Sequence, residues 1–440
     1  MKTETQNKKP SFITLLPFVF FIASFLIFGV LTNSFYLIPS PLAVIIGIVV
    51  AVLLYKGSID SKMETFIKGC GDSKIITMCI IYLLAGAFAV VTKYIGGVDA
   101  IVYFGLQNFD LRFLPLCVFI IASFLSTASG TSVGSIVALG PIVMGFSEVT
   151  PDLLPLLAGS LLGGAMFGDN LSMISDTSIA ATQSLNCDIK DKFRVNLYIA
   201  LPAAVITSLL LFLFGLSSTP IENALILTEV NYWTIIPYIL VIILALIGLN
   251  VFATLFIGIL ISGIIGFIIG SFTWIEYCIE IYNGFLSMID IFLLSLLTGG
   301  LAAMVEKEGG IQFLVTKIKG LIKTPKSAQV GIGLITTFIN TAIANNTVSI
   351  VVAGPIVKDI NDDFRLDNRK SATIMDIFAC IVQGLLPYGA QILLLLSYEG
   401  TNLSYGQIFC SSFYLYILLF FTILAIYFKP LDRFILSKMK

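Results

Sequence analysis

The 440-residue chain contains no histidine and has few charged residues, which make up 12% of the sequence. Histidine is the side chain whose ordinary pKa lies nearest neutrality. Without it, proton transfer near neutral pH falls to carboxylates in an unusual environment. The seven cysteines are scattered and odd in number, which predicts neither a disulfide framework nor a metal motif.

Hydrophobic residues make up 58% of the chain, and apolar runs of membrane-spanning length recur from Phe12 to Phe428. The connecting segments are too short to form a soluble domain. We therefore predict an all-α, multi-pass membrane protein whose residues 1–440 form a single integral domain. The first apolar run lacks a small-residue cleavage site, so we expect a first span rather than a signal peptide.

Four of the apolar stretches are interrupted by glycine, proline or polar residues. Backbone breaks at membrane depth are tolerated only where they face protein or a water-filled cavity. The interrupted stretches are 113–147, 153–187, 328–357 and 371–398. The uninterrupted spans are predicted at 12–32, 41–55, 75–92, 195–217, 232–247, 252–270, 284–305 and 406–428.

The positions of lysine and arginine predict the orientation in a bacterial cytoplasmic membrane. If both termini are cytoplasmic, only Lys93 and Arg112 remain on the outer side. This arrangement requires 113–147 and 328–357 each to return to the side from which they entered, as re-entrant hairpins or as paired spans. The cytoplasmic group then includes Lys74, Lys190, Lys192 and Arg194.

The two halves of the chain resemble each other in sequence. Residues 83–98 match 296–311 without a gap, and 127–143 match 341–357. Each half contains five crossings and one returning element, so the halves must have opposite orientations in the membrane. The predicted repeats are 1–217 and 232–428.

The predicted fold thus has two inverted-topology repeats, about 10 transmembrane crossings and two re-entrant hairpins or paired spans. Its broken helices lie near the membrane midplane. Inverted repeats with paired broken helices are typical of secondary transporters, whose binding site lies at the repeat interface.

A cluster of polar side chains interrupts the stretch 153–187. Hard cations such as Na⁺ prefer oxygen ligands. On a regular helix Asp169, Ser172 and Asp176 share one face, so both aspartates would point into one cavity. If the segment unwinds at 168–172, that spacing weakens, but we expect the donors to converge locally. Two nearby buried carboxylates repel each other, so one would hold a proton until a cation displaces it. The alternative is that these groups cap the broken helix. The six oxygen donors are Asp169, Asn170, Ser172, Ser175, Asp176 and Thr177.

The other breaks supply neutral donors. Through the repeat, Asp169 aligns with Gln383, so the acidic pair exists in one half only and the other half would contribute neutral oxygens. Asp290 lies well inside an apolar run, whereas Asp376 and Glu306 lie close enough to span ends to reach the interface. Helix capping explains part of the polar set. The neutral candidates are Ser129, Thr131, Ser132, Asn345, Asn346 and Thr347.

The pattern Gly-Asp-x-x-Ser-x-x-Ser-Asp-Thr at 168–177, together with the segment 130–134 and the Gly-Pro-Ile turns, resembles the NhaC family of sodium/proton antiporters. The resemblance extends roughly from Pro41 to the end of the chain. It implies cation/proton antiport driven by the proton gradient, with Asp169 and Asp176 in the exchange site. This chain has Met173 and Ser178 where family members commonly have proline and threonine.

We therefore expect Na⁺/H⁺ exchange by alternating access, with Na⁺ bound at Asp169 and Asp176 and no cofactor besides the transported ions. The alternative is Na⁺- or H⁺-coupled transport of a small organic acid or amino acid; a channel or scaffold is a third hypothesis. We expect no enzymatic activity and no nucleic-acid partner, while the sequence allows a homodimer in the lipid bilayer. No arginine is predicted inside a span, so no buried guanidinium awaits a substrate carboxylate, although helix N-termini can bind one. The arginines are Arg112, Arg194, Arg365, Arg369 and Arg433.

Overall fold

The computed structural model describes residues 11–31, 39, 41–108, 110–146, 150–217, 231–398 and 403–428. Within these ranges the secondary structure consists of α-helices and short 3-10 turns, without strands. The predicted cytoplasmic placement of both termini lies outside the described residues, as does Arg433.

Every predicted uninterrupted span corresponds to a helix. Of the described helices, seven are long and apolar enough to cross a membrane, or eight if the bent pair formed by α20 (Tyr405–Ser411) and α21 (Phe413–Tyr427) counts as one span. Shorter apolar helices complete the set, which confirms the multi-pass all-α fold. The other helices that correspond to predicted uninterrupted spans are α4 (Ser73–Tyr94), α10 (Ile189–Ser217), α12 (Val251–Ile269) and α14 (Ile289–Lys307), together with the shorter α1 (Leu16–Leu31), α2 (Pro41–Leu54) and α11 (Ile236–Leu246).

The four predicted interruptions are present as breaks between successive helices. Two of these pairs are hairpins and two are broken spans. The hairpins are α6 (Leu114–Ser129) with α7 (Ser132–Gly145), and α16 (Pro325–Ile343) with α17 (Asn346–Phe364). The broken spans are α8 (Leu154–Leu171) with α9 (Asp176–Leu185), and α18 (Asn368–Leu385) with α19 (Ala390–Ser397).

For four further helices, the sequence predicts no separate span. Polar residues recur through most of them, so they lack a long apolar run. The predicted start of the span 284–305 is wrong, because the chain breaks at Met288 and the preceding residues belong to a separate helix. The four helices are α3 (Ile59–Cys70), α5 (Gly97–Asn108), α13 (Trp274–Ser287) and α15 (Gly310–Lys319).

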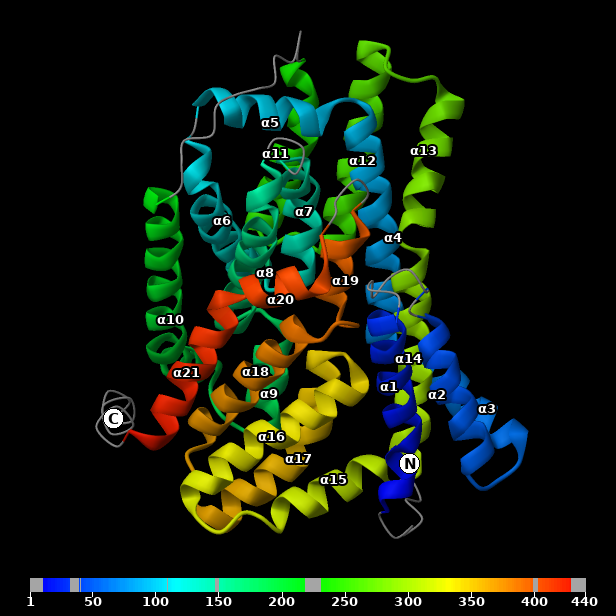
Figure 1. The fold of residues 1–440 in the computed structure, drawn as a ribbon, viewed down its shortest axis with the longest axis vertical. Helices are drawn as coiled ribbons and strands as arrows, with labels where there is room; N and C mark the ends of the chain where they lie inside the picture. Colours follow the sequence, from blue (N-terminus) through cyan, green and yellow to red (C-terminus); the bar gives the residue numbers. More distant parts are fainter. Residues whose placement is uncertain are drawn as a thin grey trace.

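The two halves are arranged in opposite senses (Figure 1). Helix α5 lies at one end of the molecule, and α15, its counterpart in the second half, lies at the opposite end. The α6–α7 hairpin occupies the upper half of the view and the α16–α17 hairpin the lower half, with their tips toward the middle. This arrangement favours re-entrant hairpins, one from each side.

One group of helices combines α1–α5 with α11–α15. Within it α3 packs on α14 and α13 packs on α4, so each half supplies the partner of the other. Small residues make these crossings close: a side chain at Gly86 would overlap the Gly284 carbonyl, and one at Gly69 would overlap Gly299. Close approach through glycine is a common way to pack helices in membranes.

The second group, which we call the hairpin group, consists of α6–α10 and α16–α21. Here α6 packs on α8, α16 on α18, α9 on α17, and α10 on α21. All four helix breaks lie in this group. It therefore holds the predicted site residues, except the secondary candidate Asp290, which lies in α14.

Candidate ion-binding site

Glycines let the broken helix α8 approach the first hairpin. A side chain at Gly164 would overlap the Phe119 carbonyl, and a Cβ atom at Gly168 would lie 2.5 Å from the Ser123 carbonyl oxygen. Because both glycines face α6, the two backbones come into direct contact. This packing places Asp169, the next residue along α8, beside the hairpin tip.

Asp169 is buried, with 4% of its surface exposed, and both of its carboxylate oxygens accept hydrogen bonds. Ser132 at the start of α7 donates to Oδ2 from its backbone N–H at 3.2 Å and from its hydroxyl at 2.7 Å. The Ser175 hydroxyl donates to Oδ1 at 2.5 Å. The N-terminus of α7 also favours a negative charge. Asp169 thus joins the break in α8–α9 to the tip of the first hairpin.

The break itself is held by its own hydroxyl groups. Ser172 donates to the Thr127 carbonyl of the hairpin at 2.8 Å. Ser175 caps α9 through the Thr177 backbone N–H at 3.3 Å, and the two hydroxyls lie 2.9 Å apart. The predicted capping role and contact with Asp169 are therefore combined in one residue, Ser175.

A chain of hydrogen bonds connects Asp169 to the second hairpin. The Gln391 amide donates to the Ser132 hydroxyl at 3.0 Å, and Gln383 donates to Gln391 Oε1 at 3.2 Å. Gln383 also donates to the carbonyl of Ala344 at the second hairpin tip, at 3.1 Å. Gln383, the repeat counterpart of Asp169, is thereby linked to it through two side chains. Gln391 was not among the predicted residues.

The predicted amides of the second hairpin act mainly on their own helix. Asn345 caps α17 through the Val348 backbone N–H at 3.0 Å, and the Asn346 side chain accepts from the Thr347 backbone N–H at 3.0 Å. The Asn345 amide also lies 3.1 Å from the Met78 sulfur of α4. Gln383 reaches only the backbone carbonyl of the neighbouring Ala344, and among the described residues no hydrogen bond joins the Asn345 or Asn346 side chain to Asp169.

In the first hairpin, Thr131 caps α7 through the Gly134 backbone N–H at 3.3 Å. Several buried oxygen atoms of this region have no hydrogen-bond partner within the described ranges. Such atoms are rare in folded proteins, and a bound water or ion is one way to satisfy them. They are Ser129 Oγ, Asn170 Oδ1, Asn196 Oδ1 and Gln383 Oε1.

The prediction that Asp169 and Asp176 point into one cavity is wrong. The Asp176 side chain is 62% exposed and pairs with Lys74 of α4. The reason is the break at residues 172–175, which removes the helical spacing that would have placed the two aspartates on one face. Asp176 instead starts α9 and faces the other helix group.

A different buried carboxylate lies near Asp169. Asp376 of α18 is 0% exposed and forms an ion pair with Lys192 of α10, which is 1% exposed. The expectations that Asp376 reaches the interface and that Lys192 lies in a cytoplasmic connection are therefore wrong. Helix α10 begins at Ile189 and carries Lys192 into the hairpin group. The sequence signal was available, since Asp376 stands inside the apolar stretch 371–398.

The secondary candidate Asp290 is exposed in the first turn of α14. A carboxylate there is favoured by the helix N-terminus. Glu306 is exposed near the other end of the same helix. Neither residue belongs to the hairpin group, and the structure does not bring them to Asp169.

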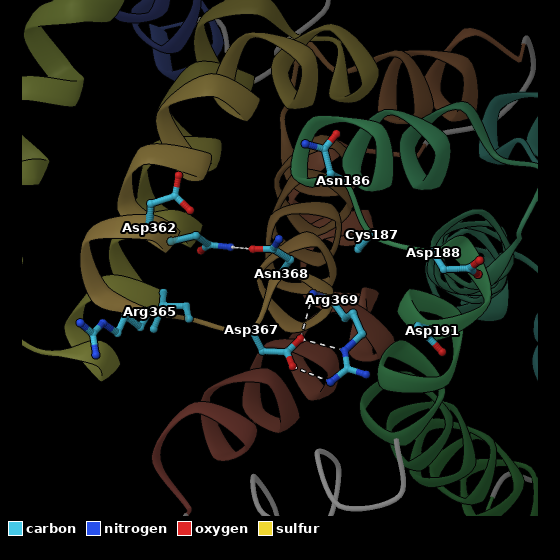
Figure 2. A pocket seen from close by; sticks show the side chains of 11 residues that line it. Asn186, Cys187, Asp188, Asp191, Asp362, Arg365, Asp367, Asn368 and Arg369 are labelled. Carbon is cyan, nitrogen blue, oxygen red and sulfur yellow. Dashed lines mark hydrogen bonds and ion pairs between the residues drawn. The ribbon is translucent and has the colours of Figure 1, made fainter. Parts of the chain in front are cut away.

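A polar pocket of about 540 Å³ opens where α9 joins α10 and α17 joins α18 (Figure 2). Arg369 and Asp367 form a two-point ion pair there. Burial raises the pKa of Asp367, but the Arg369 guanidinium and backbone N–H groups outweigh it and hold the pKa below its ordinary value. The described arginines all lie outside the buried core, as predicted. The lining residues are Asn186, Cys187, Asp188, Asp191, Asn361, Asp362, Arg365, Leu366, Asp367, Asn368 and Arg369.

Fold and site together define a membrane transporter built from two inverted repeats. The profile of the Na⁺/H⁺ antiporter family matches residues 4–216 and again 216–429, once in each half. The chain belongs to this family. The match also confirms that the chain consists of two related halves.

Curated relatives cover most of the chain. The malate-2H⁺/Na⁺-lactate antiporter of Bacillus subtilis is 27% identical over 70% of this chain and 72% of its own length. The Na⁺/H⁺ antiporter NhaC of the same organism is 24% identical over 76% and 79%. The arginine/ornithine antiporter ArcD of Halobacterium salinarum is 23% identical over 87% and 85%. Among solved structures, the Alcanivorax borkumensis YdaH transporter matches with a TM-score of 0.42 and 13% identity, covering 85% of this chain and 89% of its own.

Proposed function

We propose that the protein exchanges Na⁺ for H⁺ across the cytoplasmic membrane by alternating access, with Asp169 binding either ion. The observation that carries this proposal is the buried carboxylate of Asp169 at a helix break, held by Ser132 and Ser175. An isolated buried carboxylate is costly unless a positive charge compensates it. A proton or a sodium ion supplies that charge, and each excludes the other.

Unpartnered oxygens offer further ligands for the cation. Asn170 follows Asp169 directly, and its Oδ1 atom is buried without a hydrogen-bond partner among the described residues. The hydroxyls of Ser132 and Ser175 can turn their lone pairs toward a sodium ion, because a hydroxyl both donates and accepts. In this proposal these oxygens and the Asp169 carboxylate replace the water shell of the ion.

The division into two helix groups supports the proposal of alternating access. The contacts between the groups include the exposed Lys74–Asp176 ion pair and the Asn345–Met78 contact. Exposed ion pairs are worth little energy, typically about 0–1 kcal/mol. We propose that the hairpin group moves against the other helices when Asp169 is loaded, and that the polar pocket gives ions access from one side.

A second candidate is the coupled exchange of a small organic acid or amino acid. It is favoured by the names of the relatives that exchange lactate and malate or arginine and ornithine. The absence of a buried arginine among the described residues argues against a carboxylate substrate, since Arg is the usual two-point partner of carboxylates.

Purified protein in liposomes tests the two candidates directly. Internal pH is followed while Na⁺, Li⁺ or K⁺ is added, and uptake of labelled lactate, malate and arginine is measured in parallel. We expect proton movement driven by Na⁺ without any organic substrate. Saturable organic-acid uptake, together with proton movement that does not change when Na⁺ is added, would overturn the proposal.

The role of Asp169 is tested by Asp169→Asn, with Asp290→Asn as the matched control at an exposed site. Asp169→Asn should abolish exchange, because an amide can neither release a proton nor balance a cation. Asp290→Asn should exchange at the wild-type rate. If the Asp169→Asn protein retains the wild-type apparent Na⁺ affinity, another residue binds the ion.

A further inference from the structure

The Lys192–Asp376 ion pair is the most deeply buried pair of opposite charges among the described residues. Lys192 belongs to the first half of the chain and Asp376 to the second. Both lie in the hairpin group, where α10 packs on α18. A pair within one group of helices remains together when that group moves as a unit.

The ammonium group of Lys192 has three protein acceptors. Besides Asp376 Oδ2, it donates to the Asn170 carbonyl oxygen at 3.0 Å and to the Ser178 hydroxyl at 2.8 Å. An ammonium group has three hydrogens, so every one has an acceptor. These partners replace water completely and hold the positive charge against the backbone of Asn170, the residue after Asp169.

Among the described titratable groups around this ion pair, Asp169 is a buried carboxylate that has no ion-pair partner. Cys380 of α18 contacts Asp376 through its sulfur at 3.8 Å, Tyr414 of α21 interacts with both, and Cys187 precedes α10. None of these is a carboxylate. Asp169 is close enough to interact electrostatically with Asp376.

One other buried charge, Lys370, lies six residues before Asp376, about 9 Å along the helix at 1.5 Å per residue. It donates at 2.8 Å to the Ala425 carbonyl oxygen in the last turn of α21. A helix C-terminus attracts a cation. The positive charge of Lys370 is thus stabilised by the C-terminal end of α21 and not by Asp169.

We propose that Lys192 is a built-in cation that permanently occupies Asp376, so that one Na⁺ exchanges for one proton and transport is electroneutral. This inference rests on the proposed Na⁺/H⁺ exchange. With Lys192 and Asp376 cancelling each other, Asp169 carries the single charge that a transported ion must balance. The hairpin group therefore has the same net charge whether it carries Na⁺ or H⁺.

Removal of Lys192 converts Asp376 into a second uncompensated carboxylate. Lys192→Gln should then exchange two protons, one on each carboxylate, for one Na⁺, and so move one net charge per cycle. Asp376→Asn leaves the ammonium beside Asp169 without its partner, and apparent Na⁺ affinity should fall at least tenfold. The double variant Lys192→Gln/Asp376→Asn removes both charges and should exchange electroneutrally again.

The experiment measures the equilibrium Na⁺ gradient in liposomes at a fixed pH gradient, with and without a tenfold K⁺ gradient and valinomycin. Movement of one net charge per cycle shifts that Na⁺ gradient by about tenfold, whereas electroneutral exchange leaves it unchanged. We expect no shift for the wild type and the double variant, and a shift for Lys192→Gln. A merely structural ion pair would not change the potential dependence.

A potential-dependent shift in the wild-type protein overturns the inference. So does an unshifted gradient in a folded Lys192→Gln protein. If that variant does not fold, the wild type and the double variant still test the inference, because a potential-dependent Na⁺ gradient in either protein contradicts it. Wild-type protein that moves no protons in response to Na⁺ contradicts the proposed function instead, so the two failures are distinct.

Discussion

Gly130 and Ala344 occupy the same position in the two hairpins, and both adopt the left-handed backbone conformation, with φ of 68° and 54°. Each ends the first helix of its hairpin and is followed by a capping residue, Thr131 or Asn345. Glycine adopts this conformation without strain, whereas alanine does not. The second hairpin therefore retains a strain that the first one lacks.

Ala344→Gly should stabilise the protein by about 1 kcal/mol, because it relieves the left-handed strain. Gly130→Ala should destabilise it by more, since the added Cβ atom would also lie 2.9 Å from the Ile174 side chain. Thermal unfolding of the purified variants in detergent compares them. Equal and opposite shifts would show that backbone strain alone matters, and a lower melting temperature for Ala344→Gly would contradict the assignment.

Ser132→Ala should weaken Na⁺ binding. It removes the hydroxyl that donates to Asp169 and accepts from Gln391. Hydrogen bonds to charged groups are worth about 1.5–3 kcal/mol, so the apparent affinity should fall roughly tenfold to a hundredfold. Ser160→Ala is the matched control, because that hydroxyl is buried in the same helix as Asp169 without a partner among the described residues. Similar losses in both variants would speak against a specific role of Ser132.

Asp176→Asn and Lys74→Gln should each leave exchange within about tenfold of wild type, because an exposed ion pair contributes only about 0–1 kcal/mol. Their effects on transport rate should not add in the double variant, since both remove one pair. Initial rates of Na⁺-driven proton movement measure this. Loss of Na⁺ binding in Asp176→Asn alone would make Asp176 a ligand, as the sequence pattern first indicated.

Cys187 offers a test of the pocket. Burial, followed by the charge of Asp367, raises the pKa of the Cys187 thiol to about 11. Only the thiolate reacts with iodoacetamide, so labelling should be slow near neutral pH and rise about tenfold per pH unit until roughly pH 11. A variant in which Cys187 is the only cysteine, labelled over that range, provides the measurement. Fast labelling at neutral pH would show an exposed, ordinary thiol.

The sequence predicted the helices and breaks well, because apolar length and interrupting residues are local properties. It also drew attention to Asp169, a carboxylate inside an apolar stretch, and the structure buries this side chain. It misplaced Asp176, since the direction of a side chain after a break depends on how the chain re-enters a helix. It missed Lys192 because a lysine near a span end usually reaches water, and only the packing of α10 against α18 shows that this one does not.

Gln391 was missed for a related reason. A glutamine near a helix break has many ordinary explanations, and its contact with Ser132 joins residues that are far apart in the chain. Sequence reasoning identifies polar residues that stand out within their own apolar segment. It does not identify residues whose role depends on a contact with the other half of the chain.

The exchange of partners between α3–α14 and α4–α13 has a consequence for folding. In each half the long helix is covered by a short helix of the other half: α13 packs on α4, and α3 packs on α14. A first half made alone would expose the glycine-lined faces around Gly69 and Gly86. To bury them it would have to meet another copy inserted in the opposite direction, so the single chain behaves as a covalently joined antiparallel pair.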